Sequence, residues 1–98
     1  ARPHDLWLHA QNIPGSHVVV RCPEGREPPE TTLYQAALLA AYHSRARLSS
    51  RVPVDYTRCR HVRKPAGARP GFVIYDHQRT LYVTPSAENL KALQSVSS

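Results

Sequence analysis

Arginine side chains are concentrated in the middle of this chain. Eight of the thirteen Lys and Arg residues lie between positions 43 and 69, where Asp55 is the only acid, and arginine outnumbers lysine eleven to two overall. Arginine's planar fork suits bidentate phosphate contacts and stacking on bases, whereas lysine alone would suffice for solubility. The block predicts a polyanion-binding face, with RNA as the first candidate. Its members are Arg45, Arg47, Arg51, Arg58, Arg60, Arg63, Lys64 and Arg69.

The segments beside the block suggest how it would meet phosphate. Residues 64–71 contain two prolines and two glycines, so we expect a stiff loop whose glycines permit close approach of the backbone. Such contacts recognise a structured RNA by its backbone and shape more than by its sequence. A second RNA contact is predicted at a Pro-Gly turn that places Ser16 beside His17, with Arg21 assisting. The alternative is a tight turn without a binding role.

Other chemistries have weaker support. His9, His17 and Asp5 suggest an RNA-processing enzyme, but no Gly-x-Ser-x-Gly elbow, phosphate-binding glycine loop or carboxylate pair accompanies them. Cys22, Cys59 and the scattered histidines lack the paired spacing of structural zinc. We therefore expect a protein that is not an enzyme and that has no metal or cofactor.

Three further residues have competing interpretations. Trp7 could stack on a base, but the single tryptophan of a small domain is more often a core residue. Tyr56, beside the arginines, is the best stacking candidate among the tyrosines. Asp55 is expected to be a partner for arginines or a turn acceptor.

Length and composition bound the answer. A chain of 98 residues with 41% hydrophobic content is one small domain with one modest core, and a net charge of +6 favours an anionic partner. Two cysteines are few for a secreted domain of this size, so a reducing, cytoplasmic setting is expected, with one structural disulfide left open. No segment approaches the roughly 18 apolar residues of a membrane span. The absence of any methionine suggests a piece of a larger protein.

The elements that must position these residues follow from patterns of apolar and turn residues. Large or β-branched runs predict strands at 5–10 and 17–21, the second one buried. Thr32 and Gln35 fit a capping box at the start of an alanine-rich helix, whose last turn would carry Arg45 and Arg47. A further strand is expected at 54–63.

The C-terminal third is predicted to form a hairpin and a tail. Residues 72–75 and 80–84 are expected to pair around a polar turn, and 86–98 to form a short terminal helix and a flexible end. The fold class is α+β, a mostly antiparallel sheet of about five strands with one principal helix packed on it and a short C-terminal helix. The expected domain is 1–85.

Five segments of the chain, at residues 5–10, 13–18, 36–47, 52–57 and 64–71, form a set of motifs. Each motif alone is weak, but five in register are specific. Together they resemble the NFACT-R domain, the C-terminal RNA-binding module of NFACT ribosome-quality-control proteins. The likeness runs in order from about Arg2 to Pro85 and leaves the tail outside.

The resemblance implies a function for the basic block. Proteins of this family resemble the bacterial factor once described as fibronectin-binding, which engages obstructed large ribosomal subunits, recruits tRNA and directs alanine-rich tails onto stalled chains. The expected partners are therefore large-subunit RNA, tRNA and further domains of a larger NFACT-type protein, without a membrane. The alternatives are a protein–protein interaction module with a basic rim and, less favoured, the RNA-processing enzyme.

Overall fold

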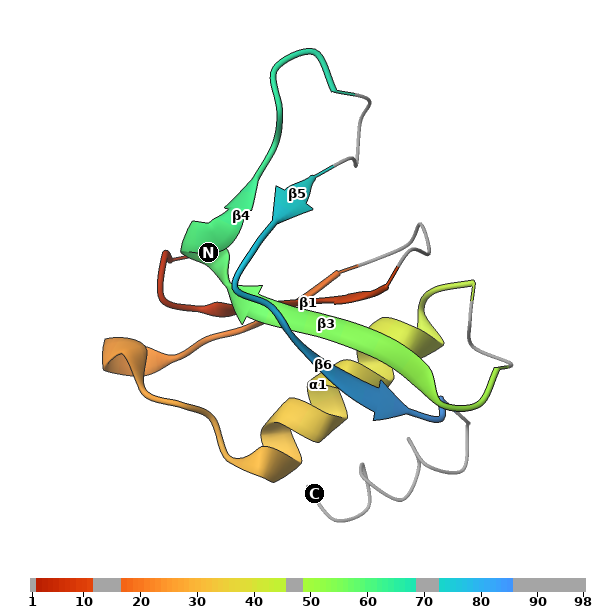
Figure 1. Ribbon diagram of the computed structural model, residues 1–98. Helices are drawn as coiled ribbons and strands as arrows, with labels where there is room; N and C mark the ends of the chain where they lie inside the picture. The colour runs from red at the N-terminus through yellow and green to blue at the C-terminus, as the bar shows by residue number, and fades with distance from the viewer. Residues whose placement is uncertain (1, 12–16, 46–48, 69–72, 86–98) are drawn as a thin grey trace.

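The computed structural model describes residues 2–11, 17–45, 49–68 and 73–85 (Figure 1). The main sheet has four antiparallel strands in the order β2-β1-β3-β6. These strands are β1 (Leu6–Ala10), β2 (Val18–Val20), β3 (Val52–Arg58) and β6 (Arg79–Val83). A second sheet pairs β4 (Val62–Arg63) with β5 (Ile74–Tyr75). The α+β class and the mostly antiparallel sheet are confirmed, although the strands divide between two sheets.

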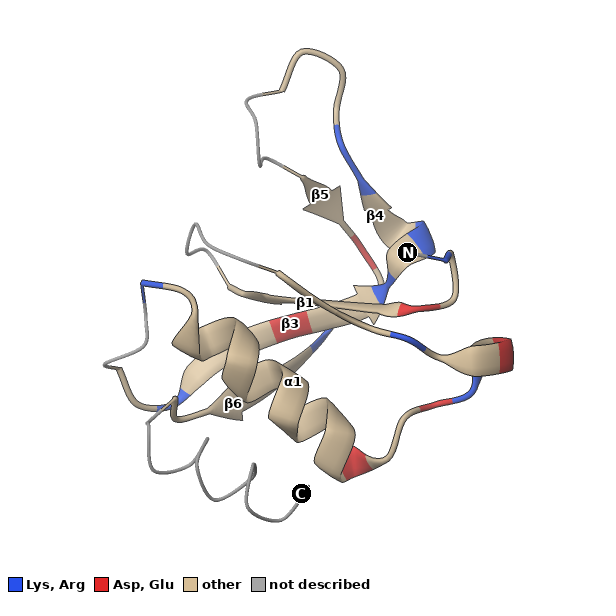
Figure 2. Ribbon diagram, turned by 180° about the vertical axis from the view of Figure 1, so that it is seen from behind, with Lys and Arg blue, Asp and Glu red and all other residues tan. Residues whose placement is uncertain are grey.

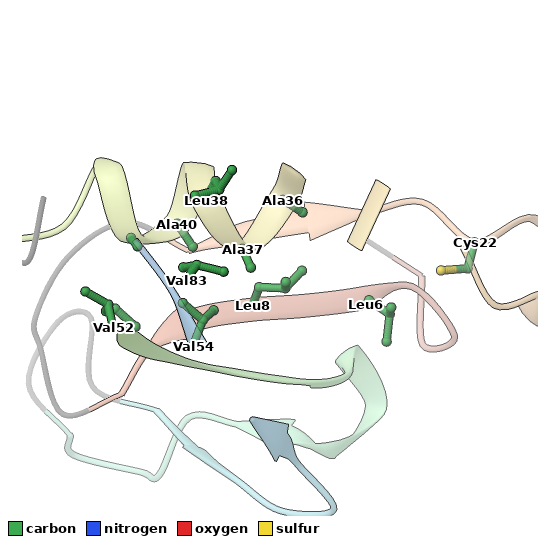
Figure 3. Packing of buried hydrophobic residues seen from close by; sticks show 12 residues of the cluster. Leu6, Leu8, Cys22, Ala36, Ala37, Leu38, Ala40, Val52, Val54 and Val83 are labelled. Carbon is green, nitrogen blue, oxygen red and sulfur yellow. The ribbon is translucent and has the colours of Figure 1, made fainter. Parts of the chain in front are cut away.

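Side-chain alternation along β1 and β3 gives the main sheet two different faces. Leu6, Leu8 and Ala10 of β1 belong to the hydrophobic core together with Val52 and Val54 of β3. Because neighbours along a strand point to opposite faces, these residues share the side covered by α1 (Figure 3). Complete burial of one Leu or Val side chain stabilises the fold by about 1.5–3 kcal/mol.

Helix α1 (Glu30–Tyr42) lies across this face and contributes mainly alanines to the core. Ala37, Ala40 and Ala41 have no exposed surface, which places the helix backbone close to the strands. The predicted capping box is wrong. The helix begins at Glu30 after the N-cap Pro29, which makes no side-chain capping bond, because the preceding prolines hold the chain extended until that point.

The predicted end of the helix is also wrong. α1 stops at Tyr42, and no basic residue lies in its last turn. Arg45 is exposed in the connection that follows, and Arg47 lies outside the described residues. Neither can therefore be assigned to the negative end of the helix dipole.

The strand predicted at 54–63 is interrupted. β3 ends at Arg58, and the 3₁₀ turn η2 (Cys59–His61) redirects the chain into β4. The predicted hairpin is wrong for the same reason. β5 pairs with β4, whereas β6 pairs with β3, so the two segments expected to pair belong to different sheets. The change of direction at η2 provides β5 with a partner away from the main sheet.

Strand β2 lies at an edge of the main sheet and is not buried as predicted. Its central residue Val19 is 37% exposed, and Val18 and Val20 are only partly buried. β-branched residues favour a strand at an edge as well as in a core, so composition could not separate the two cases.

Trp7 packs on the sheet face opposite α1. Its side chain is buried, stacks on His9 with ring centroids 5.4 Å apart, and lies 4.8 Å from the ring of Tyr75 in β5. The expectation that Trp7 is a packing residue is confirmed, with the correction that it belongs to a second cluster and not to the core under the helix.

Membrane-spanning helices are absent from the described part of the chain. Among the described residues, no helix has the length and apolar character needed to span a membrane. The helix and tail predicted for 86–98 lie outside the described residues, so the proposed boundary at 85 stays a prediction.

Candidate nucleic-acid interface

Among the residues that the structure describes, exposed cations are concentrated where β3 is followed by η2 and β4. Arg60 on η2, Arg63 on β4 and Lys64 directly after it are all exposed, and Figure 2 shows their segments in blue along one end of the molecule. We call Arg60, Arg63 and Lys64, together with Arg2, the η2–β4 basic group. A 3₁₀ turn followed by a short strand keeps these residues within a few positions of one another.

Backbone hydrogen bonds bring Arg2 to the same place. The N–H of Arg60 donates to the carbonyl of Pro3 at 3.0 Å, and the N–H of Cys59 donates to the carbonyl of Asp5 at 2.8 Å. Arg2 is exposed and directly precedes Pro3, which accepts one of these hydrogen bonds. The sequence interpretation missed it because 58 positions separate it from Arg60 and no local motif links the two.

Carboxylates neutralise little of this group. Arg63 Nη2 lies 3.2 Å from Asp76 Oδ2, but its side chain is 65% exposed, and an exposed pair contributes only about 0–1 kcal/mol. Arg60 Nε makes one long contact of 3.4 Å with His61 Nε2. Within the described part of the chain, no carboxylate pairs with Arg60 or Lys64. The group therefore keeps its positive charge.

Arg58 is engaged inside the fold. One terminal nitrogen, Nη1, donates to the carbonyl of His4, while Nη2 lies 2.8 Å from a carboxylate oxygen of Glu27 and 3.3 Å from the carbonyl of Gly25. Only 17% of the side chain is exposed. The guanidinium clamps three segments together, so the predicted phosphate contact would have to compete with these acceptors.

Arg51 lies at the other end of β3. Arg58 lies seven positions further along the chain, at the end of β3, and seven steps of a strand span about 23 Å. The guanidinium carbon of Arg51 lies 5.6 Å from the ring centroid of Tyr82, and its backbone N–H donates to Thr84 Oγ1 at 3.1 Å. Arg45 is exposed in the same α1–β3 connection. Among the described members of the predicted block, Arg51 is therefore well separated along β3 from Arg58 and from the η2 turn that follows it.

The remaining predicted contacts are less well placed. His17 is exposed, with its ring centroid 6.1 Å from that of Trp7, and Arg21 is exposed just after β2. Ser16, Arg47 and Arg69 lie outside the described residues. Of the three residues predicted to make the second RNA contact, the structure therefore describes His17 and Arg21.

Asp55 and Tyr56 have roles other than those expected. Asp55 is 2% exposed and accepts hydrogen bonds from Tyr75, Thr80 and Gln11, and no arginine of the described segments donates to it. Tyr56 is partly buried against the core under α1, so it is not an exposed stacking residue beside the cations. Strand alternation sends Tyr56 to the helix side and Asp55 to the other.

Three groups around the interface, the carboxyls of Asp76 and Asp5 and the thiol of Cys59, have shifted pKa values. A hydrogen bond with His77, and the charges of His77, Arg63 and His61, lower the pKa of the Asp76 carboxyl. Backbone N–H groups of Cys22 and Arg2 donate to the Asp5 carboxylate and lower the pKa of Asp5, so Asp5 accepts hydrogen bonds that hold the local fold. Burial and the nearby Asp5 raise the pKa of the Cys59 thiol.

The two cysteines, for which one disulfide was left open, are both free thiols. Cys22 is buried in the core, and Cys59 is partly buried at the first position of η2. Neither bridges the segments around the η2–β4 basic group, which hydrogen bonds hold instead.

Comparison with known proteins identifies a matching family and close relatives of this chain. Residues 1–76 match the family model described as NFACT protein RNA binding domain. The Rqc2 homolog RqcH of Bacillus subtilis is 57% identical over 90 residues, covering 92% of this chain and 15% of that protein. The Rqc2 homolog RqcH of Streptococcus suis is 44% identical over 94 residues, covering 96% of this chain and 17% of that protein.

A solved structure gives the same result. The C-terminal part of the fibronectin/fibrinogen-binding protein from Streptococcus suis aligns with a TM-score of 0.83 and 43% identity, covering 94% of this chain and 36% of that chain. This chain spans 15% and 17% of the lengths of the two RqcH relatives. The resemblance read from five sequence motifs is confirmed, and the chain belongs to the NFACT RNA-binding domain family.

Proposed function

We propose that this domain binds the RNA of the large ribosomal subunit, tRNA, or both, and serves ribosome-associated quality control of stalled translation in the cytoplasm. The observation that carries the proposal is the η2–β4 basic group, whose cations are exposed and largely free of carboxylate partners. The domain acts by binding and not by turnover, as part of a larger NFACT-type protein. The names of the RqcH relatives support the setting.

The residues proposed to contact RNA are chosen by the exposure of their side chains. Arg60 and Lys64 are the principal phosphate ligands, with Arg2 and Arg63 beside them. Arg45 and Arg51 would form a separate contact at the far end of β3, reached by an RNA that extends along the sheet. His17 and Arg21 are the proposed contacts near β2, together with Ser16, and Arg47 and Arg69 remain candidates from the basic block. Arg58 is the least favoured because its acceptors lie within the domain.

The test compares two variants with the same loss of charge. Arg60→Gln/Lys64→Gln removes two cations of the η2–β4 basic group, and Arg26→Gln/Arg79→Gln removes two exposed cations elsewhere. Affinity for purified large subunits and for tRNA is measured over a salt series. Each lost phosphate contact reduces the slope of log affinity against log salt by about one, so the first variant should lose about two.

Three outcomes would contradict the proposal. If the two variants lose the same affinity, RNA binding depends on the net charge of the domain and not on the η2–β4 basic group. Binding to ribosomes that survives ribonuclease and changes little with salt would favour the protein-interaction alternative. Cleavage of tRNA by the purified domain would restore the enzyme hypothesis.

A further inference from the structure

Two histidines and one aspartate converge beside the small sheet. Asp76 and His77 follow β5, and His61 ends η2 directly before β4. One potential ligand atom from each of the three lies within 4.8 Å of the other two. No local motif reveals this cluster, because His61 and Asp76 are 15 positions apart, a spacing that matches no zinc motif.

The geometry around one carboxylate oxygen is close to that of a metal site. His77 Nδ1 lies 2.9 Å and His61 Nδ1 lies 3.5 Å from Asp76 Oδ1. In a tetrahedral zinc site with metal–ligand distances near 2.1 Å, neighbouring ligand atoms lie about 3.4 Å apart. Of the three side chains only that of His77 is exposed, and those of His61 and Asp76 are partly buried, so small rotations would suffice to bring the three atoms around one ion.

The backbone holds the two segments in this arrangement. The N–H of Asp76 donates to the carbonyl of His61 at 3.3 Å, and Thr57 Oγ1 donates to the carbonyl of Asp76 at 2.9 Å. His77 has a φ of 58°, in the left-handed region that residues other than glycine rarely adopt. The imidazole rings of His61 and His77 stack with centroids 4.2 Å apart.

We propose that His61, Asp76 and His77 form a binding site for a divalent transition metal, with zinc as the best-suited ion. Two imidazole nitrogens and one carboxylate oxygen suit zinc and its neighbours, and not magnesium or calcium, which prefer oxygen ligands. Three protein ligands leave a coordination position open to water. The proposal does not depend on RNA binding.

Neighbouring arginines modify the site. Arg63 contacts Oδ2 of Asp76, which leaves Oδ1 for the metal and orients the carboxylate, as outer partners of metal ligands commonly do. Arg60 donates to His61 Nε2, and this nitrogen must carry the proton when Nδ1 binds metal. Metal binding therefore requires the 3.4 Å contact of Arg60 to break, and Arg60→Gln should bind metal at least as tightly as the unaltered chain.

The test uses cobalt(II) as a spectroscopic probe and zinc as the competitor, with the 98-residue chain purified free of metal. One equivalent of cobalt should give the visible absorption of a site with nitrogen and oxygen ligands, and zinc should displace it. His61→Gln, Asp76→Asn and His77→Asn should each lower the affinity at least about tenfold, since even partners outside the ligand shell are worth about 10–100-fold. Asparagine suits the left-handed backbone at 77, so the last variant keeps the fold.

His43→Ala serves as the matched control, because His43 is exposed in the described structure and lies outside the cluster. It should bind cobalt as the unaltered chain does. No saturable binding, the same affinity in every variant, or the intense near-ultraviolet bands of cobalt–thiolate bonds from Cys22 or Cys59 would overturn the proposal. Circular dichroism of each variant separates loss of the site from loss of the fold.

Discussion

The hydroxyl of Tyr75 donates a 2.6 Å hydrogen bond to Oδ2 of Asp55, and this bond joins the small β4–β5 sheet to the main sheet. The other oxygen of Asp55 accepts from Thr80 Oγ1 at 2.8 Å and from Gln11 Nε2 at 3.4 Å. A buried carboxylate must be satisfied in this way because an unpaired charge is costly away from water. Since β4 carries part of the η2–β4 basic group, the bond also helps to position the proposed RNA face.

Replacement of Tyr75 by Phe should therefore destabilise the domain. The ring and its contact with Trp7 remain, but Asp55 loses one donor. A hydrogen bond to a charged group contributes about 1.5–3 kcal/mol, and we expect a loss of this size in the free energy of unfolding in urea. Tyr82→Phe is the control, because Tyr82 is 58% exposed and should change stability by less than about 0.5 kcal/mol. Equal effects would show that the bond between the sheets is unimportant.

Asp5 should make stability depend on pH in the acid range. Asp5 is 4% exposed as a residue, and its carboxylate accepts hydrogen bonds from the backbone N–H of Cys22 at 2.9 Å and of Arg2 at 3.0 Å. These bonds lower the pKa of Asp5 in the folded state below its ordinary value of 3.8. A lowered pKa means that the contribution is present above about pH 4 and is lost as the pH falls through the folded-state value.

The measurement is the unfolding free energy of the unaltered chain and of Asp5→Asn between pH 7 and pH 3. The unaltered chain should be more stable at pH 7, and the difference should shrink below pH 4. Glu24→Gln is the control, since Glu24 has a side chain that is 78% exposed. If the difference in unfolding free energy between the two proteins stays constant with pH, the ionisation of Asp5 does not contribute to stability.

The main helix and sheet could be predicted because local pattern decides them. The alanine-rich segment of α1 and the alternation in β1 and β3 place apolar side chains on one side, and burial enforces the same choice. The start of α1 was misplaced because two signals compete there. Thr32 and Gln35 fit a capping box, but Pro29 is extended and serves as the N-cap, so the helix begins at the next residue, Glu30.

The site could be predicted only in part, because a list of charges does not show which ones are already paired. Arg58 was included among the RNA-binding candidates, yet its acceptors are His4, Gly25 and Glu27, which are 54, 33 and 31 residues away. Only the folded chain brings them to Arg58. The pairing of β5 with β4 is similar, since neither two-residue strand has a pattern of its own.

Arg58 and Arg60 should therefore behave in opposite ways when each is replaced by lysine, a change that keeps the charge. In Arg58→Lys a single ammonium nitrogen cannot take the places of both Nη1 and Nη2, so we expect the free energy of unfolding to fall by about 1–3 kcal/mol. Its affinity for tRNA, measured well below the unfolding temperature, should stay within about twofold of the unaltered chain. Because Arg60 is exposed, Arg60→Lys should leave stability within about 0.5 kcal/mol.

Arg60→Lys should weaken RNA binding through the loss of the planar fork, and Arg60→Gln should weaken it further through the loss of charge. Arg26→Lys is the control for both measurements, since the Arg26 side chain is 80% exposed and lies outside the η2–β4 basic group. If Arg58→Lys instead weakens tRNA binding while the fold keeps its stability, its guanidinium must leave Glu27 to contact phosphate. Arg58 would then belong to the interface, and the clamp seen in the free domain would be a state that RNA displaces.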